Sequence, residues 1–182
     1  MAPKDGIEKV LVSEEELKEI CVELGKQISA DYKGKNLLLI SVLKGAVVFM
    51  ADLLKEITCE CKIDFMAVSS YSGTKTTGVV KFKKDLDVNP DGQDILIVED
   101  ILDSGITLSY LKKILKDRNA NSIKVCTLLD KPANRRADIK ADYVGKVIPD
   151  EFVVGYGLDY NEYFRNLPYV GVLSPSVYGT EK

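Results

Sequence analysis

Apolar residues recur at two different spacings along the chain, and each spacing predicts one kind of element. Ser13 and Glu16 have the spacing of a helix capping box, and the apolar positions that follow predict a helix over residues 14–30. A second helix is expected over 46–55, and a third, with an apolar face at helical spacing, is expected to end near Arg118.

Short apolar runs predict the strands. Asn36–Leu43, Ile95–Glu99 and Ser122–Asp130 are nearly continuous apolar runs, which are typical of strands buried on both faces. Further strands are expected over 62–71, 79–86, 143–148, 152–154 and 169–173. Because strands and helices alternate, the sequence predicts an α/β domain with a mostly parallel central sheet flanked by helices. Ligands of such sheets bind beyond the carboxyl ends of the strands.

One segment between two predicted strands has the composition of a loop. Ser72–Gly78 places Gly, Ser and Thr around one lysine and contains no apolar residue. We expect a flexible flap here. No repeat, low-complexity tract or linker divides the chain, so a single domain is expected.

Length and composition narrow the possible functions. The chain has 182 residues, 46% of them hydrophobic, which suits one domain with a substantial core. Its net charge of -3 argues against bulk electrostatic binding to nucleic acid. The N-terminal segment lacks the pattern of a secretory leader, and no later segment is apolar over the roughly 20 residues that a membrane span needs. We therefore expect a soluble, cytoplasmic protein.

The cysteine and histidine content limits the chemistry further. Cys21, Cys59, Cys61 and Cys126 are expected to be reduced thiols, mostly buried. Cys59 and Cys61 could share a metal, but without histidine or a second cysteine pair we discard a zinc site. The absence of histidine also excludes an imidazole base, so a general base must be Asp, Glu, Lys, Tyr or Cys.

The segment "ILIVEDILDSGITL", Ile95 to Leu108, carries the clearest chemical signal. A buried strand ends here in three carboxylates, Glu99, Asp100 and Asp103. Like charges at a strand end repel one another, so their clustering indicates a cation or a polyhydroxyl ligand that compensates them.

The turn that follows these acids has a simple and a functional interpretation. In the simple one, Asp103 or Ser104 merely caps the next helix. In the functional one, Gly105 permits close approach of the backbone, while the amides and the hydroxyls of Ser104 and Thr107 donate to phosphate oxygens. The segment matches neither the Walker loop nor GxGxxG, so a sugar phosphate fits better than a nucleoside triphosphate.

This segment resembles the phosphoribosyl pyrophosphate (PRPP) motif of the type I phosphoribosyltransferases. Over nearly the whole chain the resemblance is to the hypoxanthine-guanine phosphoribosyltransferases, through "SVLKGAVVFMADL", "SSYSGTKTTG", "LLDKPANRR" and "IPDEFVVGYGLDYNEYFRNLPYVGVL". It implies the type I phosphoribosyltransferase fold with a small hood subdomain and a flexible flap loop. The single domain would span 1–182, with a core over about 34–148 and a hood formed by the N-terminal segment and about 149–182.

The resemblance also implies roles for the acids and the turn. Glu99 and Asp100 would bind the ribose hydroxyls, and Asp103 would serve as the general base that takes a proton from the purine. The full set implied for the ribose and 5-phosphate is Glu99, Asp100, Asp103, Ser104, Gly105, Ile106 and Thr107. Ile106 stands at a position that varies in the family and supplies no cation.

The pyrophosphate and the flap involve other segments. By resemblance, Leu43, Lys44 and Gly45 form the pyrophosphate loop, a position associated with a non-proline cis peptide, and Arg165 reaches the same group. Without the resemblance, a lysine at a strand end is usually just solvated. Ser70 and Tyr71 match the start of the flexible loop that would close over the site.

The purine and the metal complete the implied site. Lys131 would donate to the exocyclic oxygen of a 6-oxopurine, Phe152 would stack on the base, and Val153 would offer backbone groups. Asp159 would contact the purine and bind magnesium, and the implied Mg²⁺ ligands are Glu99, Asp100 and Asp159. Judged alone, Lys131 could equally be a turn lysine, and Phe152 could belong to a core strand.

Together these features imply Mg²⁺-dependent transfer of 5-phosphoribosyl from PRPP to hypoxanthine or guanine, in a homodimer or homotetramer. A rival from another class is a regulator that keeps this fold to sense a nucleotide and bind nucleic acid. The acidic charge and the implied purine pocket favour the enzyme. The ranking of hypoxanthine, guanine and xanthine stays open, as does regulation by nucleotides.

Overall fold

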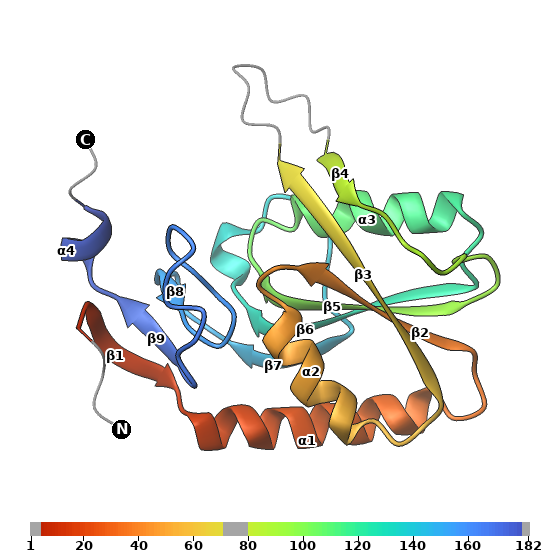
Figure 1. Cartoon of the computed structure of the whole chain (residues 1–182), viewed down its shortest axis with the longest axis horizontal. Coiled ribbons are helices and arrows are strands. Elements are labelled where there is room, and N and C mark those ends of the chain that lie inside the picture. The colour runs from red at the N-terminus through yellow and green to blue at the C-terminus, as the bar shows by residue number, and fades with distance from the viewer. Residues whose placement is uncertain (1–4, 71–79, 180–182) are drawn as a thin grey trace.

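The computed structural model describes residues 5–70 and 80–179 (Figure 1). Its strands are β1 (Ile7–Val12), β2 (Leu37–Leu43), β3 (Cys61–Ser70), β4 (Val80–Lys84), β5 (Asp94–Leu102), β6 (Ser122–Asp130), β7 (Tyr143–Val147), β8 (Val153–Val154) and β9 (Val170–Leu173). Its helices are α1 (Glu14–Asp31), α2 (Val47–Glu56), α3 (Ile106–Asp117) and the short α4 (Pro175–Tyr178), with a 3-10 turn at Pro132–Asn134. Among the described residues, no helix is long and apolar enough to cross a membrane.

The large sheet has six strands in the order β4-β3-β2-β5-β6-β7. Strands β3, β2, β5, β6 and β7 run parallel, and β4 returns antiparallel along β3. The α/β prediction with a mostly parallel sheet is therefore confirmed. The carboxyl ends of β2, β5 and β6 lie at one edge, because the register aligns Ser41 with Val98 and Leu102 with Asp130.

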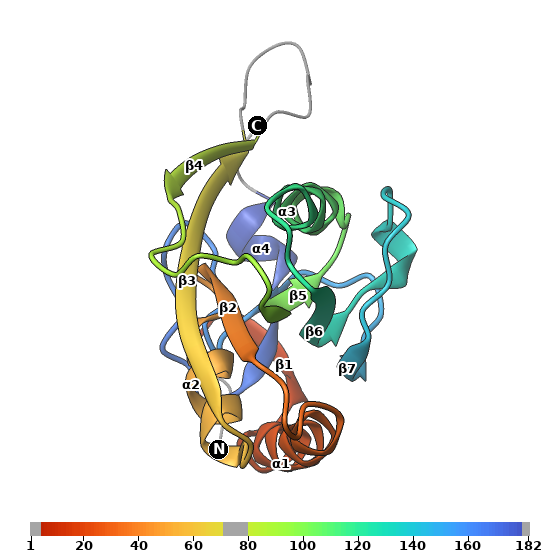
Figure 2. The same cartoon turned by 90° about the vertical axis from the view of Figure 1, so that its right-hand side faces the viewer.

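Helices cover both faces of this sheet, with α1 and α2 on one side and α3 on the other (Figure 2). Side chains of β2 alternate between the two resulting cores, so that Leu39 packs toward α1 and α2 while Leu38 and Ile40 pack toward α3. The first six residues of β2 are buried, as the continuous apolar run predicts. The Ser13 half of the capping box is confirmed, since its hydroxyl accepts from the Glu16 N–H at 3.2 Å, whereas the Glu16 carboxylate pairs with Lys146.

A second, three-stranded antiparallel sheet in the order β1-β9-β8 joins the two ends of the chain beside the large sheet (Figure 1). Strand β1 is absent from the sequence prediction, and so is α4. Lys44, just after β2, pairs at 3.0 Å with Glu162 in the segment between β8 and β9. Lys131, just after β6, pairs at 3.0 Å with Asp150 in the segment before β8. The C-terminal segment therefore lies against the carboxyl edge of the large sheet.

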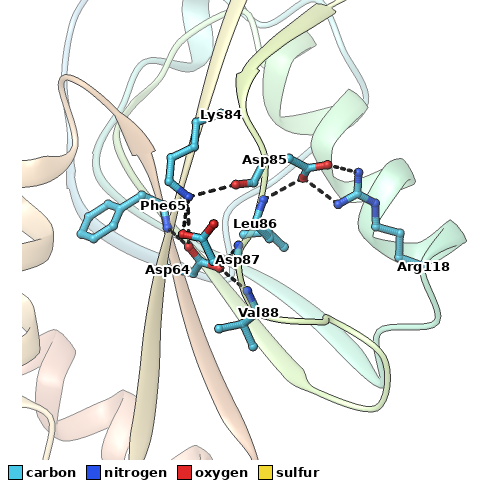
Figure 3. A network of polar contacts seen from close by, with 8 residues as sticks. All are labelled: Asp64, Phe65, Lys84, Asp85, Leu86, Asp87, Val88 and Arg118. Carbon is cyan, nitrogen blue, oxygen red and sulfur yellow. Dashed lines mark hydrogen bonds and ion pairs between the residues drawn. The ribbon is translucent and has the colours of Figure 1, made fainter.

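Buried Asp64 fixes the chain just after β4 (Figure 3). Its carboxylate accepts backbone N–H groups of Phe65, Asp87 and Val88 at 2.7–2.8 Å and lies 3.5 Å from Lys84 Nζ. Burial opposes ionisation of Asp64, but these N–H donors and the lysine charge outweigh it and lower its pKa. The turn that follows β4 is thereby held to β3.

Candidate active site

Glu99 and Asp100 lie within β5, which runs to Leu102 and does not end at Glu99 as the apolar run predicts. Because successive strand residues face opposite sides, Asp100 shares the face of Val98 and Glu99 shares the face of Ile97. Burial raises the pKa of Asp100 to about 6. Burial, followed by the charge of Asp100, raises the pKa of Glu99 well above its usual range. Burial without a compensating cation therefore disfavours the charged form of both acids.

Glu99 borders a small cavity, about 160 Å³, between the end of β5 and the start of α3. The lining residues are Glu99, Ile101, Leu102, Asp103, Ser104, Gly105, Thr107 and Leu108. Within the described residues, neither Glu99 Oε2 nor Asp103 Oδ1 has a hydrogen-bond partner, although both atoms are buried. Buried carboxylate oxygens without partners are rare in folded proteins and indicate a ligand position.

The simple interpretation of the turn, a side-chain cap from Asp103 or Ser104, is wrong. The N-cap of α3 is Gly105, at a φ of 76°, and no side chain caps the helix by hydrogen bonding. The nearest approach is that of the Ile106 N–H to Ser104 Oγ at 3.5 Å, which is long for a hydrogen bond. The positive end of α3 therefore faces the cavity with its first amides available to an anion.

Arg135 holds the backbone of this turn, a role that the sequence prediction missed. Its guanidinium donates to the carbonyls of Leu102 at 2.9 Å and Asp103 at 2.8 Å, and it also pairs with Asp130. A Cβ on Gly105 would lie 3.0 Å from Arg135 Cδ and 2.5 Å from a methyl of Ile139. Glycine is thus required both for the positive φ and for the close packing.

The peptide bond between Leu43 and Lys44 is cis, as the resemblance implied. Gly45 lies directly against the acid of β5, because a Cβ on it would lie 1.8 Å from Asp100 Oδ2. Lys44 Nζ pairs with Glu162 at 3.0 Å, and Arg165 pairs with the same carboxylate at 3.2 Å. The two side chains predicted to bind pyrophosphate, Lys44 and Arg165, therefore pair with the same carboxylate, that of Glu162.

Lys131 and Phe152 also lie close together at the carboxyl edge of β6. Lys131 is 8% exposed, and its ammonium donates to the Glu151 carbonyl at 3.3 Å, next to Phe152. The Phe152 ring is 40% exposed and stacks on Tyr178 of α4, with ring centroids 5.1 Å apart and planes inclined by 26°. Val153 follows within β8, paired with Val172 of β9.

The predicted metal ligands do not gather into one group. Asp159 pairs with Arg165 at 2.9 Å, and no three carboxylate or thiol side chains among the described residues cluster as a metal site. All four cysteines are free, and Cys21 and Cys126 are buried. Of the predicted flap residues, Ser70 ends β3, and Tyr71 lies outside the described residues.

Two larger cavities, of about 630 and 610 Å³, adjoin this region, and Arg165 lies in the walls of both. Arg165 donates to the Gly157 carbonyl at 2.7 Å. Residues of α1 and α2 line the first of these cavities, and the segment 160–166 lines most of the second.

Comparison with known proteins agrees with this geometry. The model of the phosphoribosyl transferase domain matches residues 11–161. The hypoxanthine-guanine phosphoribosyltransferase of Bacillus subtilis is 58% identical over 96% of this chain and 98% of its own length. The bifunctional protein TilS/HprT of Listeria innocua is also 58% identical, but this chain spans 27% of its length.

Solved structures give the same grouping. A hypoxanthine phosphoribosyltransferase of Staphylococcus aureus superposes with a TM-score of 0.93 at 53% identity, covering 96% of this chain and 95% of that one. The hypoxanthine phosphoribosyl transferase of Trypanosoma cruzi superposes with a TM-score of 0.94 at 40% identity, covering 98% and 97%. The chain belongs to the phosphoribosyltransferase family and, within it, groups with the hypoxanthine-guanine phosphoribosyltransferases.

Proposed function

We propose that this chain transfers the 5-phosphoribosyl group of PRPP to N9 of hypoxanthine or guanine, giving IMP or GMP and pyrophosphate in purine salvage. The observation that carries the proposal is the cavity of about 160 Å³ at the end of β5, with buried acids on one wall and the uncapped end of α3 on the other. Family membership supports the same reaction.

Two kinds of group would hold the sugar phosphate. The amides and hydroxyls from Ser104 to Thr107, Gly105 and Ile106 included, would bind the 5-phosphate at the N-terminus of α3. Glu99 and Asp100 would accept hydrogen bonds from the ribose hydroxyls. Burial raises the pKa of both carboxylates, and hydrogen bonds from these hydroxyl donors would favour their ionised forms.

Magnesium fits the acids of this region. Mg²⁺ usually keeps several waters and binds through one or two carboxylates plus substrate phosphates, so it does not need three clustered protein ligands. We propose that one or two of the predicted carboxylates, Glu99, Asp100 and Asp159, hold it together with water and substrate phosphates. When bound, the ion would supply positive charge that neutralises the pyrophosphate.

The leaving group would lie beside the Leu43–Gly45 loop. There Lys44 and Arg165, now paired with Glu162, would pair with pyrophosphate oxygens. During transfer the bond from C1 of the ribose to pyrophosphate breaks, and its electron pair leaves with pyrophosphate. The lone pair of N9 forms the new C1–N9 bond, and Asp103, whose Oδ1 is buried without a partner among the described residues, would take the purine proton.

The purine would stack on Phe152 and receive a hydrogen bond from Lys131 at its 6-oxo group. Backbone groups of Val153, together with Asp159, would contact the opposite edge of the base. Adenine offers an amino donor at position 6, which would leave the buried ammonium of Lys131 facing another donor. The site would therefore select 6-oxopurines.

We also propose the setting of this activity. The strands β1, β8 and β9 would form the hood over the site, and Ser70 and Tyr71 would begin a flap that excludes water from the cationic sugar. The enzyme would act in the cytoplasm as a homodimer or homotetramer. Helix α2, where Val47 is 40% exposed, is the proposed contact between copies.

The test is turnover of hypoxanthine and of guanine by the purified chain with PRPP and Mg²⁺, compared with Asp103→Asn. Removing the acceptor of the purine proton should lower kcat by about 10²–10⁴-fold while PRPP still binds. A chelator should abolish turnover, and added Mg²⁺ should restore it. Full activity of Asp103→Asn would refute the role of this residue, and turnover without any divalent cation would refute the metal.

A further inference from the structure

Three segments far apart in sequence lie in direct contact at the pyrophosphate loop, and they contain Gly45, Asp100 and Gly157. Gly45 lies against Asp100 on one side, as its missing Cβ shows. On the other side, a Cβ on Gly157 would lie 2.0 Å from the Gly45 carbonyl oxygen. A shift of the Gly157 segment would therefore move the pyrophosphate loop directly.

The Gly157 segment has an unusual backbone. Gly155, Tyr156 and Gly157 all have positive φ, at 98°, 51° and 99°. A tyrosine with positive φ is uncommon and persists only where the surroundings hold it. Gly157 also exchanges two hydrogen bonds with Arg165, since its N–H donates to the Arg165 carbonyl at 3.0 Å and its carbonyl accepts from the guanidinium at 2.7 Å.

The Tyr156 side chain ties this segment to α2. Its hydroxyl donates to Asp52 Oδ2 at 2.6 Å, the residue is 7% exposed, and Cys21 Sγ lies 3.7 Å from the same hydroxyl. Burial, together with the bond to Asp52, raises the pKa of Tyr156 far above its usual range, so the hydroxyl remains a donor. Helix α2 begins at Val47, two residues after the pyrophosphate loop.

We propose that the Tyr156–Asp52 hydrogen bond is a clasp that positions Arg165 and the Leu43–Gly45 loop for pyrophosphate. This inference rests on the proposed function. The clasp closes a ring that runs from the loop through α2 and Asp52 to Tyr156, and from there through Gly157 back to the loop. Tyr156 is a positioning residue, because its hydroxyl faces α2 and acts through its neighbours.

The chain contains a matched control for this bond. The Tyr143 hydroxyl donates to Asp31 Oδ2, also at 2.6 Å, and Tyr143 is 6% exposed. This second pair joins β7 to α1, away from the pyrophosphate loop. Tyr143→Phe and Tyr156→Phe therefore remove the same kind of hydrogen bond, and only one of them belongs to the ring.

The experiment compares KM for PRPP, KM for hypoxanthine, Kd for inorganic pyrophosphate with Mg²⁺, and Tm in both variants. Loss of a hydrogen bond to a charged group corresponds to roughly tenfold or more in an equilibrium constant. We expect Tyr156→Phe to raise KM for PRPP and Kd for pyrophosphate about tenfold, with KM for hypoxanthine unchanged within about twofold. Tyr143→Phe should lower Tm to a similar extent and leave all three constants unchanged.

Asp52 gives a second arm. Asp52→Asn keeps an oxygen acceptor and should retain a near wild-type KM for PRPP. Asp52→Leu should raise KM for PRPP and Kd for pyrophosphate as much as Tyr156→Phe does. If Tyr156→Phe lowers Tm but leaves KM and Kd at wild-type values, the bond is only structural and the clasp is refuted. A wild-type chain that neither turns over nor binds pyrophosphate would instead refute the proposed function, and the clasp with it.

Discussion

Gly45→Ala is the perturbation whose effect follows most directly from the geometry. The new Cβ would lie 1.8 Å from Asp100 Oδ2 and 2.9 Å from its Cγ. Contacts this short cannot persist, so the carboxylate or the loop must move by more than 1 Å to reach ordinary van der Waals distance. Asp100 belongs to a buried strand end and has little room to move.

The magnitude has a stability part and a kinetic part. Overpacking a buried position typically costs about 1–3 kcal/mol. For a chain of this length, each kcal/mol lowers Tm by about 2–4 °C, so a fall of about 2–12 °C is expected. Because a displacement of about 1 Å at a reacting centre can reduce the rate about 100-fold, kcat/KM for PRPP should fall by roughly that factor.

Gly145→Ala is the matched control. Its Cβ would lie 2.6 Å from the Leu128 carbonyl oxygen and 2.7 Å from a methyl of Ile20, so it overpacks a position on β7 away from the site. Thermal unfolding and steady-state kinetics of the two variants are compared. Equal losses of kcat/KM for PRPP in both, or wild-type kinetics in Gly45→Ala, would refute the idea that contact between Gly45 and Asp100 sets the site.

Three further predictions follow from the packing and charges. Burial raises the pKa of Asp100 to about 6, above its unfolded value of about 3.9, so the folded state loses stability as pH rises between these two values. Asp100→Asn should therefore raise Tm by about 5 °C near pH 8 and by little below about pH 4, and an equal rise at both would contradict the reasoning. The pH dependence is opposite for Asp64, because its pKa in the folded state lies below the unfolded value, so that its stabilising effect is lost as pH falls. Asp64→Ala should lower the free energy of unfolding in urea by about 3 kcal/mol near pH 7 and by less below about pH 3. A difference that does not change with pH would refute the assignment. Removing the ring that stacks on Phe152 by Tyr178→Leu should raise KM for hypoxanthine about fivefold and leave KM for PRPP unchanged, and a change confined to PRPP would count against it.

The order of elements and the acid-rich motif were predictable from sequence because both are local signals. A buried parallel strand requires a continuous apolar run, and Leu37–Leu43 supplies one. The PRPP motif packs its acids and its turn into one short segment. The structure adds that the strand continues through the acids, since residues beyond Glu99 still pair with β6.

Other features depend on partners that are distant in sequence. Strand β1 is short, and it forms because β9 pairs with it from the other end of the chain. Arg135 supports the turn before α3 from a separate segment, and its bonds to backbone carbonyls have no sequence pattern. The Tyr156–Asp52 bond joins residues 104 positions apart. The simple interpretation of the turn before α3, a cap by Asp103 or Ser104, fails for a different reason: Gly105 takes the N-cap position at positive φ, which leaves the first amides of α3 for a ligand.

The most direct test of the account is the ratio of kcat/KM for hypoxanthine to that for adenine, measured with PRPP and Mg²⁺. The proposed hydrogen bond from the buried Lys131 to the 6-oxo group predicts a preference for hypoxanthine of about 10⁴-fold. Lys131→Met should remove most of that preference by lowering turnover of hypoxanthine. Comparable turnover of the two bases by the wild-type chain, or no turnover of hypoxanthine, would contradict the account.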